Sequence, residues 1–393
     1  MNFLKNYEKS LIYLLLLSII IFGIYLCYIG GYGSDEDTLP MIYVFETKLT
    51  QGRFVSSRFT GNPVAELGIG FLSYFFGSFV ANIFTYLFLL FGLVIFFYSF
   101  QENIKFEKLY FFLFLCLTNP ILFFDNLEPV DYSWAFFFFS LGIFFFSRKL
   151  FELSILFFAL SIGVRINYVL FVLFIILFYH FDDKISIPRR IGIFISAFIF
   201  GGLFYLPIWY ENNFNLSWLT AARPTSEGLI GILARFTYKT YISVGYLSSF
   251  FVIFYFTKNL KILKSVKNIK SLFLLCLANL LIFLWIPAEF SYLQLFLVII
   301  SFLIFAIEKK FFYYLVCIGN LFSWIIFFSP VNIHHYNEEI CAPKNAKSVS
   351  INISLEKGFY YKYIDSRDMI KCWARSESER DKRILKGDAL KID

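Results

Sequence analysis

Apolar stretches recur along this 393-residue chain from Leu11 to Phe328, and they constrain its fold more than any other feature. Several of them approach the roughly 20 residues that a helix needs to cross about 30 Å of hydrocarbon. Inside a bilayer every backbone polar group must be satisfied within the protein, so such a chain crosses it as helices. Of all residues 59% are hydrophobic and only 16% are charged, against about 25% charged in soluble domains. We therefore expect an all-α polytopic membrane protein.

Basic residues between the apolar stretches predict its topology, because Lys and Arg next to membrane spans prefer the cytoplasm. Successive clusters on one side require an even number of crossings between them, and polar breaks such as residues 163–167 divide the intervals into short spans. The six clusters are Lys5/Lys9, Lys105/Lys108, Arg148/Lys149, Lys184/Arg189/Arg190, Lys258 to Lys270 and Lys309/Lys310. We expect a bundle of about eleven spans, at 11–29, 79–100, 109–124, 132–147, 150–164, 166–181, 191–208, 241–257, 271–287, 290–307 and 311–329.

Three long polar segments then share the extracytoplasmic side of an inner (plasma) membrane: outer loops 30–78 and 209–240, and the tail 330–393. The first apolar stretch has no small-residue cleavage site after it, which indicates a retained span. Residues 1–329 form the expected membrane domain. The tail is either a small α/β unit or a partly disordered segment, and Cys341 and Cys372 could pair there as a disulfide on the oxidising side.

Several function classes lack their sequence signals. The net charge of +7 comes from basic residues in short loops between spans, where they orient the protein, so nucleic-acid binding is not expected. The chain has no P-loop, no G-x-S-x-G, no G-x-G-x-x-G and no Cys/His zinc spacing. His334 and His335 near Glu338 and Glu339 are interpreted as a solvated surface.

Acidic residues follow the first span directly, at Asp35, Glu36 and Asp37. The stretches after them, PMIYVFETKL and NPVAELGIGFLSYFFG, have apolar residues at helical spacing, which predicts helices along the membrane surface. Such helices would hold the carboxylates and Arg58 near the headgroups. A carboxylate there can remove the proton of an acceptor, and an arginine can bind phosphate. The alternative is a hydrated turn.

Cations elsewhere point to the same face. Arg165 lies at the outer end of two short spans, where an arginine needs an anionic partner or water; the alternative is that it reaches the headgroups. Arg223, Arg235 and Lys239 in the second outer loop form a basic rim, or are separate surface charges. We expect the group to favour a phosphorylated lipid ligand.

This arrangement, together with GRFVSSRFTGNPVAEL and PAEFSYLQLF, resembles the polytopic C-type (GT-C) glycosyltransferases, such as mannosyltransferases and aminoarabinose transferases. The resemblance covers residues 1–330. It implies a polyprenyl-phosphate-sugar donor taken from the outer leaflet and an inverting transfer to an extracytoplasmic glycan, lipid or protein.

The resemblance also implies residue roles. Asp37 matches the family's catalytic base and Asp35 is the second choice, although Thr38 and Leu39 stand where many members have a tyrosine. Some members hold a divalent cation, Mg or Mn, at such acidic groups, which would be Asp35 and Asp37 here.

The expected donor-binding residues come from the quoted motifs and from the outer loops. Arg58 matches the arginine of an Arg-x-Pro-Gly-x-Pro element in which Thr60 replaces a proline. Glu289 and Tyr292 match a late Pro-x-Glu-x-x-Tyr-Leu element that Gln294 follows instead of a proline. The full donor-binding set is Arg58, Glu66, Arg165, Arg223, Arg235, Lys239, Glu289 and Tyr292.

Two other functions fit a chain of this composition. An envelope-polysaccharide polymerase or ligase also uses outer-face arginines, but carries its largest loop between late spans. A lipid-linked-sugar flippase or transporter would show inverted repeats or broken helices, with ionisable groups near the membrane midplane.

Overall fold

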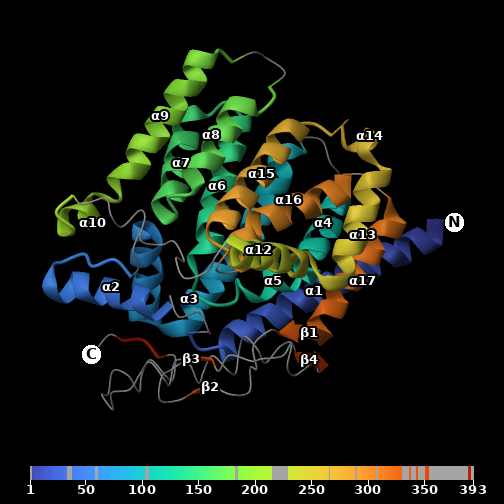
Figure 1. Cartoon of the computed structure of the whole chain (residues 1–393), viewed down its shortest axis with the longest axis horizontal. Coiled ribbons are helices and arrows are strands. Elements are labelled where there is room, and N and C mark those ends of the chain that lie inside the picture. The colour runs from blue at the N-terminus through green and yellow to red at the C-terminus, as the bar shows by residue number, and fades with distance from the viewer. Residues whose placement is uncertain are drawn as a thin grey trace.

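The computed structural model describes a helical protein whose polar turns interrupt long apolar segments (Figure 1). The described residues are 2–32, 38–57, 61–101, 106–181, 185–214, 229–264, 266–287, 290–306, 309–329, 336–337, 342–343, 350–353 and 388–390. Their helices are α1 (Asn2–Ile29), α2 (Thr38–Gln51), α3 (Pro63–Phe100), α4 (Phe106–Thr118), α5 (Pro120–Phe124), α6 (Asp131–Ser147), α7 (Phe151–Val164), α8 (Tyr168–Phe178), α9 (Ile187–Leu203), α10 (Leu206–Glu211), α12 (Leu229–Val244), α13 (Tyr246–Lys258), α14 (Leu260–Leu263), α15 (Ile269–Trp285), the 3-10 helix η1 (Phe290–Leu293), α16 (Gln294–Ala306) and α17 (Lys310–Ile325). The expectation of a helical fold is confirmed.

Two long helices are apolar enough to cross a membrane among the described residues: Lys9–Ile29 and Pro63–Phe100. The pair α12 and α13 meets the same criterion only when its two limbs are taken together. Each of the eleven predicted spans contains helix, but most of these helices have fewer than 18 residues. The number of crossings therefore stays a prediction, as does the membrane in which they lie.

The predicted surface helices of the first loop correspond to α2 and to the beginning of α3. Pro63 occupies the start of α3, where its missing N–H costs nothing. The helix continues past Gly77, whose φ of 81° and ψ of −176° interrupt the helical backbone. Glycine adopts such a conformation more readily than other residues. The interruption at Gly77 divides the surface-helix segment from the predicted span 79–100.

The predicted span 241–257 is wrong in its first residues. Residues 241–244 belong to α12, which begins at Leu229 inside the predicted outer loop 209–240. The chain then bends by 88° into α13. Gly245 lies at the bend with a φ of 98°. Apolar content predicted the segment, but the turn depends on one glycine and its packing partners.

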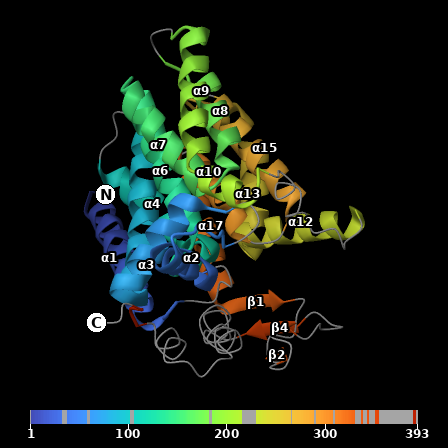
Figure 2. The same ribbon diagram turned by 90° about the vertical axis from the view of Figure 1, so that its left-hand side faces the viewer.

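The last predicted span is also too long, because α17 ends at Ile325 and strand β1 (Ile326–Ser329) follows it. β1 pairs antiparallel with β4 (Ser350–Ile353), so that Ile326 lies opposite Ile353. A second small sheet joins β2 (Tyr336–Asn337) and β3 (Ala342–Pro343). These strands lie below one end of the bundle in Figures 1 and 2.

The interior of the bundle consists largely of aromatic rings. Phe302 of α16 contacts Phe96, Phe97 and Phe100 of α3 with ring centroids 5.8 to 6.3 Å apart. All four rings are buried, and aromatic pairs of this kind add about 0.5–1.5 kcal/mol each to the energy of burial. This packing holds α3 against α16. The polar turns lie at the ends of these helices.

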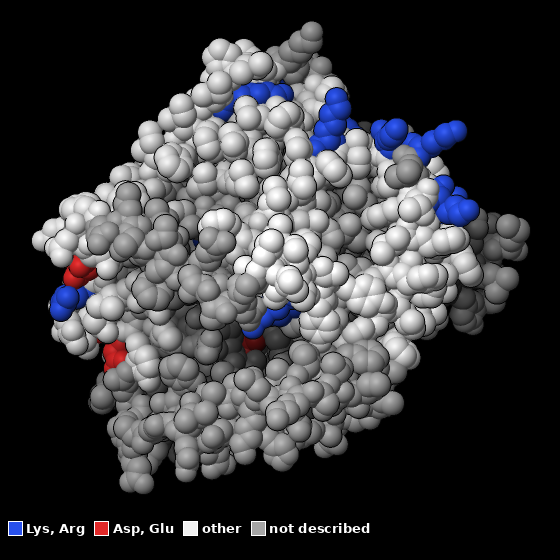
Figure 3. Space-filling model, viewed as in Figure 1, with Lys and Arg blue, Asp and Glu red and all other residues white. Residues whose placement is uncertain are grey.

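Most of the basic side chains visible in one view lie at one end of the bundle. In Figure 3 most of the coloured Lys and Arg side chains lie along the upper edge, over the ends of α9, α13 and α14 seen in Figure 1. α2, α12 and the small sheets lie away from this edge. Basic loops at one end are the pattern that orients membrane proteins, and the cytoplasmic side of this end stays a prediction.

Candidate functional site

The helix ends opposite the basic edge hold a buried ion pair. Arg165 follows the last residue of α7 in an extended backbone conformation, and Asp131 is the first residue of α6. Arg165 Nη1 lies 2.8 Å from Asp131 Oδ1 and 3.0 Å from Oδ2. The two side chains are only 7% and 1% exposed. Asp131 in a first helical turn is also favoured by the helix dipole.

Two tyrosine rings enclose the arginine. The guanidinium carbon lies 3.9 Å from the ring centroid of Tyr132 and 4.7 Å from that of Tyr292. The rings themselves meet edge to face with centroids 5.5 Å apart. Cation–π contacts of this kind contribute about 2 kcal/mol when they are shielded from water. The arginine is therefore held by one carboxylate and two rings.

The first loop reaches this pair through Asn62, the residue before α3. Asn62 donates a hydrogen bond from Nδ2 to Asp131 Oδ2 at 2.6 Å. One turn into α3, buried Glu66 accepts hydrogen bonds at Oε1 from the backbone N–H of Ser57, at 2.9 Å, and from the Ser57 hydroxyl. Glu66 thus fixes the loop at the residue that precedes Arg58.

Two further carboxylates lie in the turn that precedes Asp131. The turn between α5 and α6 buries Asp125 and Glu128, each 3% exposed. Ser291 of η1 donates a hydrogen bond to Asp125 Oδ2 at 2.6 Å. Ser291 thus contacts the acidic turn, and the next residue of η1, Tyr292, contacts the arginine. We call Asp125, Glu128, Asp131, Arg165 and Tyr292 the polar cluster.

Hydrogen bonds from Asn279 of α15 hold η1 and the start of α16 in place. Asn279 Nδ2 donates to the carbonyl of Tyr292 at 2.9 Å, and Asn279 Oδ1 accepts from the N–H of Phe296 at 3.1 Å. On the other side, Lys239 Nζ of α12 lies 5.1 Å from the ring centroid of Phe290. Figure 3 shows basic and acidic side chains together in a hollow beneath α12.

The structure joins only part of the predicted site. Arg165 and Tyr292 come together although they are far apart in sequence, and Glu66 lies at the loop end that Asn62 connects to them. Lys239 contacts η1, while Arg235 is exposed one turn earlier on α12. Outside the described residues lie Asp35, Glu36, Asp37, Arg58, Arg223, Glu289, Cys341 and Cys372.

Sequence reasoning missed Asp125, Glu128 and Asp131. Their signal was present: three acids within seven residues, in the polar break that starts at Asn119. The next break on the same predicted side contains Arg165, so opposite charges end neighbouring short helices. The opposite charges of these two polar breaks would have predicted an ion pair between Arg165 and one of the three acids.

A metal site is not formed by the described residues, among which no three His, Cys, Asp or Glu side chains are grouped to hold an ion. The predicted Mg or Mn site at Asp35 and Asp37 lies outside them. In the acidic turn, Asp125 accepts a hydrogen bond from Ser291, and Asp131 accepts hydrogen bonds from Arg165 and Asn62.

The chain matches no protein-family model, no curated protein and no solved structure.

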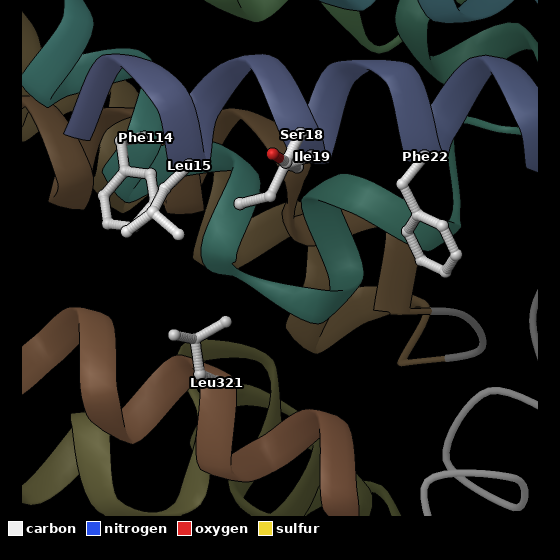
Figure 4. Close-up of a pocket in the computed structure, with 6 residues that line it drawn as sticks. All are labelled: Leu15, Ser18, Ile19, Phe22, Phe114 and Leu321. Atoms are coloured by element: carbon white, nitrogen blue, oxygen red, sulfur yellow. The ribbon is translucent and has the colours of Figure 1, made fainter. Parts of the chain in front are cut away.

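A separate apolar cavity of about 290 Å³ lies between α1, α4 and α17 (Figure 4). Its lining residues are Leu15, Ser18, Ile19, Phe22, Phe114 and Leu321. The Ser18 hydroxyl donates to the carbonyl of Leu14 at 2.9 Å, a hydrogen bond within α1. The cavity suits hydrocarbon rather than a polar substrate.

Proposed function

We propose that this protein is a membrane glycosyltransferase that moves a sugar from a polyprenyl-phosphate donor to an extracytoplasmic acceptor with inversion. The observation that carries the proposal is the buried Arg165, held by Asp131 between Tyr132 and Tyr292 at the end of short helices. A charge in such a place costs desolvation energy and is functional by default.

Transfer of a sugar from a polyprenyl-phosphate donor requires a cation near the phosphate leaving group and a base near the acceptor. Arg165 is the proposed cation, and Arg58 and the basic residues of the second outer loop are the proposed additional phosphate ligands. Asp37 is the base, with Asp35 as second choice. A phosphate that enters the polar cluster would compete with Asp131 for the guanidinium, and the tyrosine rings would keep that guanidinium in position. Donors aimed at developing charge typically account for a factor of about 10²–10³ in rate.

The first loop supports this arrangement. Glu66 holds Ser57, the residue before Arg58, and Asn62 binds Asp131. α2 begins at Thr38, directly after Asp37. The loop that would carry the base and one phosphate ligand is thus attached to the helix ends that carry Arg165.

Among the described residues the buried charges occupy helix ends rather than helix centres, which favours chemistry at a surface over passage through the bilayer. One observation favours a lipid-linked-sugar flippase instead: α12 and α13 form a broken helix, as transporters often have. The flippase is therefore kept as the second candidate.

The test uses the full chain in phosphatidylcholine vesicles that contain a radiolabelled polyprenyl-phosphate sugar. Asp37→Asn should lower transfer to an added acceptor extract by about 10²–10⁴, the usual contribution of a general base. The matched control is Glu152→Gln, an exposed acid in the first turn of α7 that should leave transfer unchanged. Full activity of Asp37→Asn would overturn the assignment, and donor flux that ignores Asp37 would support the flippase.

A further inference from the structure

α12 leaves the bundle at almost a right angle. It bends by 88° from α13, and Figure 2 shows it projecting sideways while α8, α9 and α15 run along the bundle. The bend is held by Gly245, whose surroundings include Ser248, Asn320 and Ser323. Asn119 Nδ2 also donates to the carbonyl of Ser243 at 2.8 Å. The base of α12 is therefore a packed joint.

The two faces of α12 differ. The inner face packs on the bundle: the rings of Phe236 and Phe283 have centroids 5.9 Å apart, and Lys239 lies over Phe290. The outer face is apolar and exposed, with Ile230 at 84% and Leu233 at 44%, and Leu229, 71% exposed, lies at the free end of the helix. Tyr241, 45% exposed, continues this face three turns later. Such a surface is unfavourable in water, because burying one leucine or isoleucine gains about 1.5–3 kcal/mol.

α13 also exposes apolar residues: Leu247, Phe250 and Ile253 are 41%, 65% and 63% exposed. Since α12 and α13 together have the apolar content of a membrane span, exposed apolar residues on both helices fit hydrocarbon. The only charged residues of α12 are two cations, Arg235 and Lys239, and Arg235 is exposed. Cations beside an apolar helix face complement lipid phosphates.

We infer that α12 lies along the headgroup layer of the membrane, with Leu229, Ile230 and Leu233 among the acyl chains and Arg235 at the phosphates. The inference rests on the proposal that the chain spans a membrane, and it goes beyond the proposed transfer reaction. Because Lys239 on the inner face contacts η1, lipid docking would also hold one side of the polar cluster. An anionic lipid is the favoured partner.

The experiment places a nitroxide spin label at Ile230→Cys in a full chain whose six cysteines are replaced by serine or alanine. Labels at Ile253→Cys on α13 and at Lys149→Cys in the basic turn serve as deep and shallow references. Vesicles of phosphatidylcholine alone are compared with an equimolar mixture with phosphatidylglycerol. Collision with oxygen reports hydrocarbon and collision with nickel-EDDA reports water. If the cysteine-free chain does not fold, the difference in quenching by brominated lipids between Ile230→Trp and the native chain, which has six tryptophans, measures the same depth.

We expect the label at 230 to favour oxygen over nickel, at a depth between the two references. Arg235→Glu should raise its nickel accessibility at least twofold in the anionic vesicles, and Arg235→Lys should not. Nickel accessibility equal to that at 149 would overturn the inference, and so would exclusion of both reagents, since a protein partner would then cover the face. If the label at 253 is also in water, the chain is not inserted, and the membrane proposal fails together with the docking.

Discussion

Asp131 Oδ1 lies 2.8 Å from Arg165 Nη1, although the two residues are 34 positions apart and belong to different helices. Asp131 begins α6 and Arg165 follows α7, so the pair joins two adjacent polar turns at one end of the bundle. Asn62 adds the first loop and Tyr292 adds η1. Four separate parts of the chain thus meet at one buried charge pair.

Removing one member of this pair should strongly destabilise the protein. Arg165→Met leaves Asp131 buried without its cation, and a lone buried charge costs about 3–5 kcal/mol. Thermal unfolding in detergent should show a midpoint several degrees lower. The double variant Arg165→Met with Asp131→Asn should recover part of the loss.

The matched control for the buried pair is the surface pair of Arg53 and Glu211, 3.1 Å apart, in which the arginine side chain is 63% exposed. Arg53→Met should cost less than about 1 kcal/mol, because water screens such pairs. Equal effects of the two arginine substitutions would contradict the role given to the buried pair.

Glu66→Ala should loosen the first loop. The substitution removes the acceptor of the Ser57 N–H, so amide hydrogen exchange at residues 53–57 should accelerate about tenfold if the hydrogen bond contributes about 1.4 kcal/mol. Mass spectrometry of the exchanged peptides measures this. Glu152→Ala is the control and should leave these amides unchanged, because this exposed acid lies in the first turn of α7, next to the basic turn at the other end of the bundle. Unchanged exchange in Glu66→Ala would argue against its positioning role.

Gly245→Ala should disturb the joint between α12 and α13. Its φ of 98° disfavours a side chain, and a Cβ would approach Ser248 Oγ at 3.1 Å and Asn320 Oδ1 at 3.2 Å. Strain of this kind costs about 1–3 kcal/mol, so the unfolding midpoint should fall. Gly192→Ala is the control: that glycine lies within α9 with no atom near a new Cβ, and alanine should be neutral or stabilising. A stable Gly245→Ala variant would mean that the bend relaxes without cost.

The orientation of the chain can be tested by labelling intact cells with a membrane-impermeant maleimide. Val55→Cys, in the exposed first loop, should react because the working end is proposed to face outward. Lys149→Cys, in the basic turn after α6, should react only after the cells are permeabilised. The opposite pattern would place the candidate site in the cytoplasm and exclude an outer-leaflet donor.

Much of the helical architecture was predictable because its causes are local. Apolar stretches give helices, and Pro63 starts α3. The predicted span 109–124 is interrupted instead, because α4 ends at Thr118 and a separate short helix begins at Pro120. Arg165 and Tyr292 could be selected because a charge or a motif is conspicuous against an apolar background. The extra length assigned to α17 and the straight span across Gly245 were wrong, because apolar content alone does not reveal a strand or a bend.

The residue pattern was enough to predict a helical protein with long apolar segments and candidate residues in its polar breaks. It did not reveal that Asp131 is the partner of Arg165, that two tyrosines enclose the arginine, or that α12 turns outward; these follow from how the helices pack. Helix formation depends on neighbours within a few turns, whereas the partner of a buried charge depends on which helix ends the aromatic core brings together.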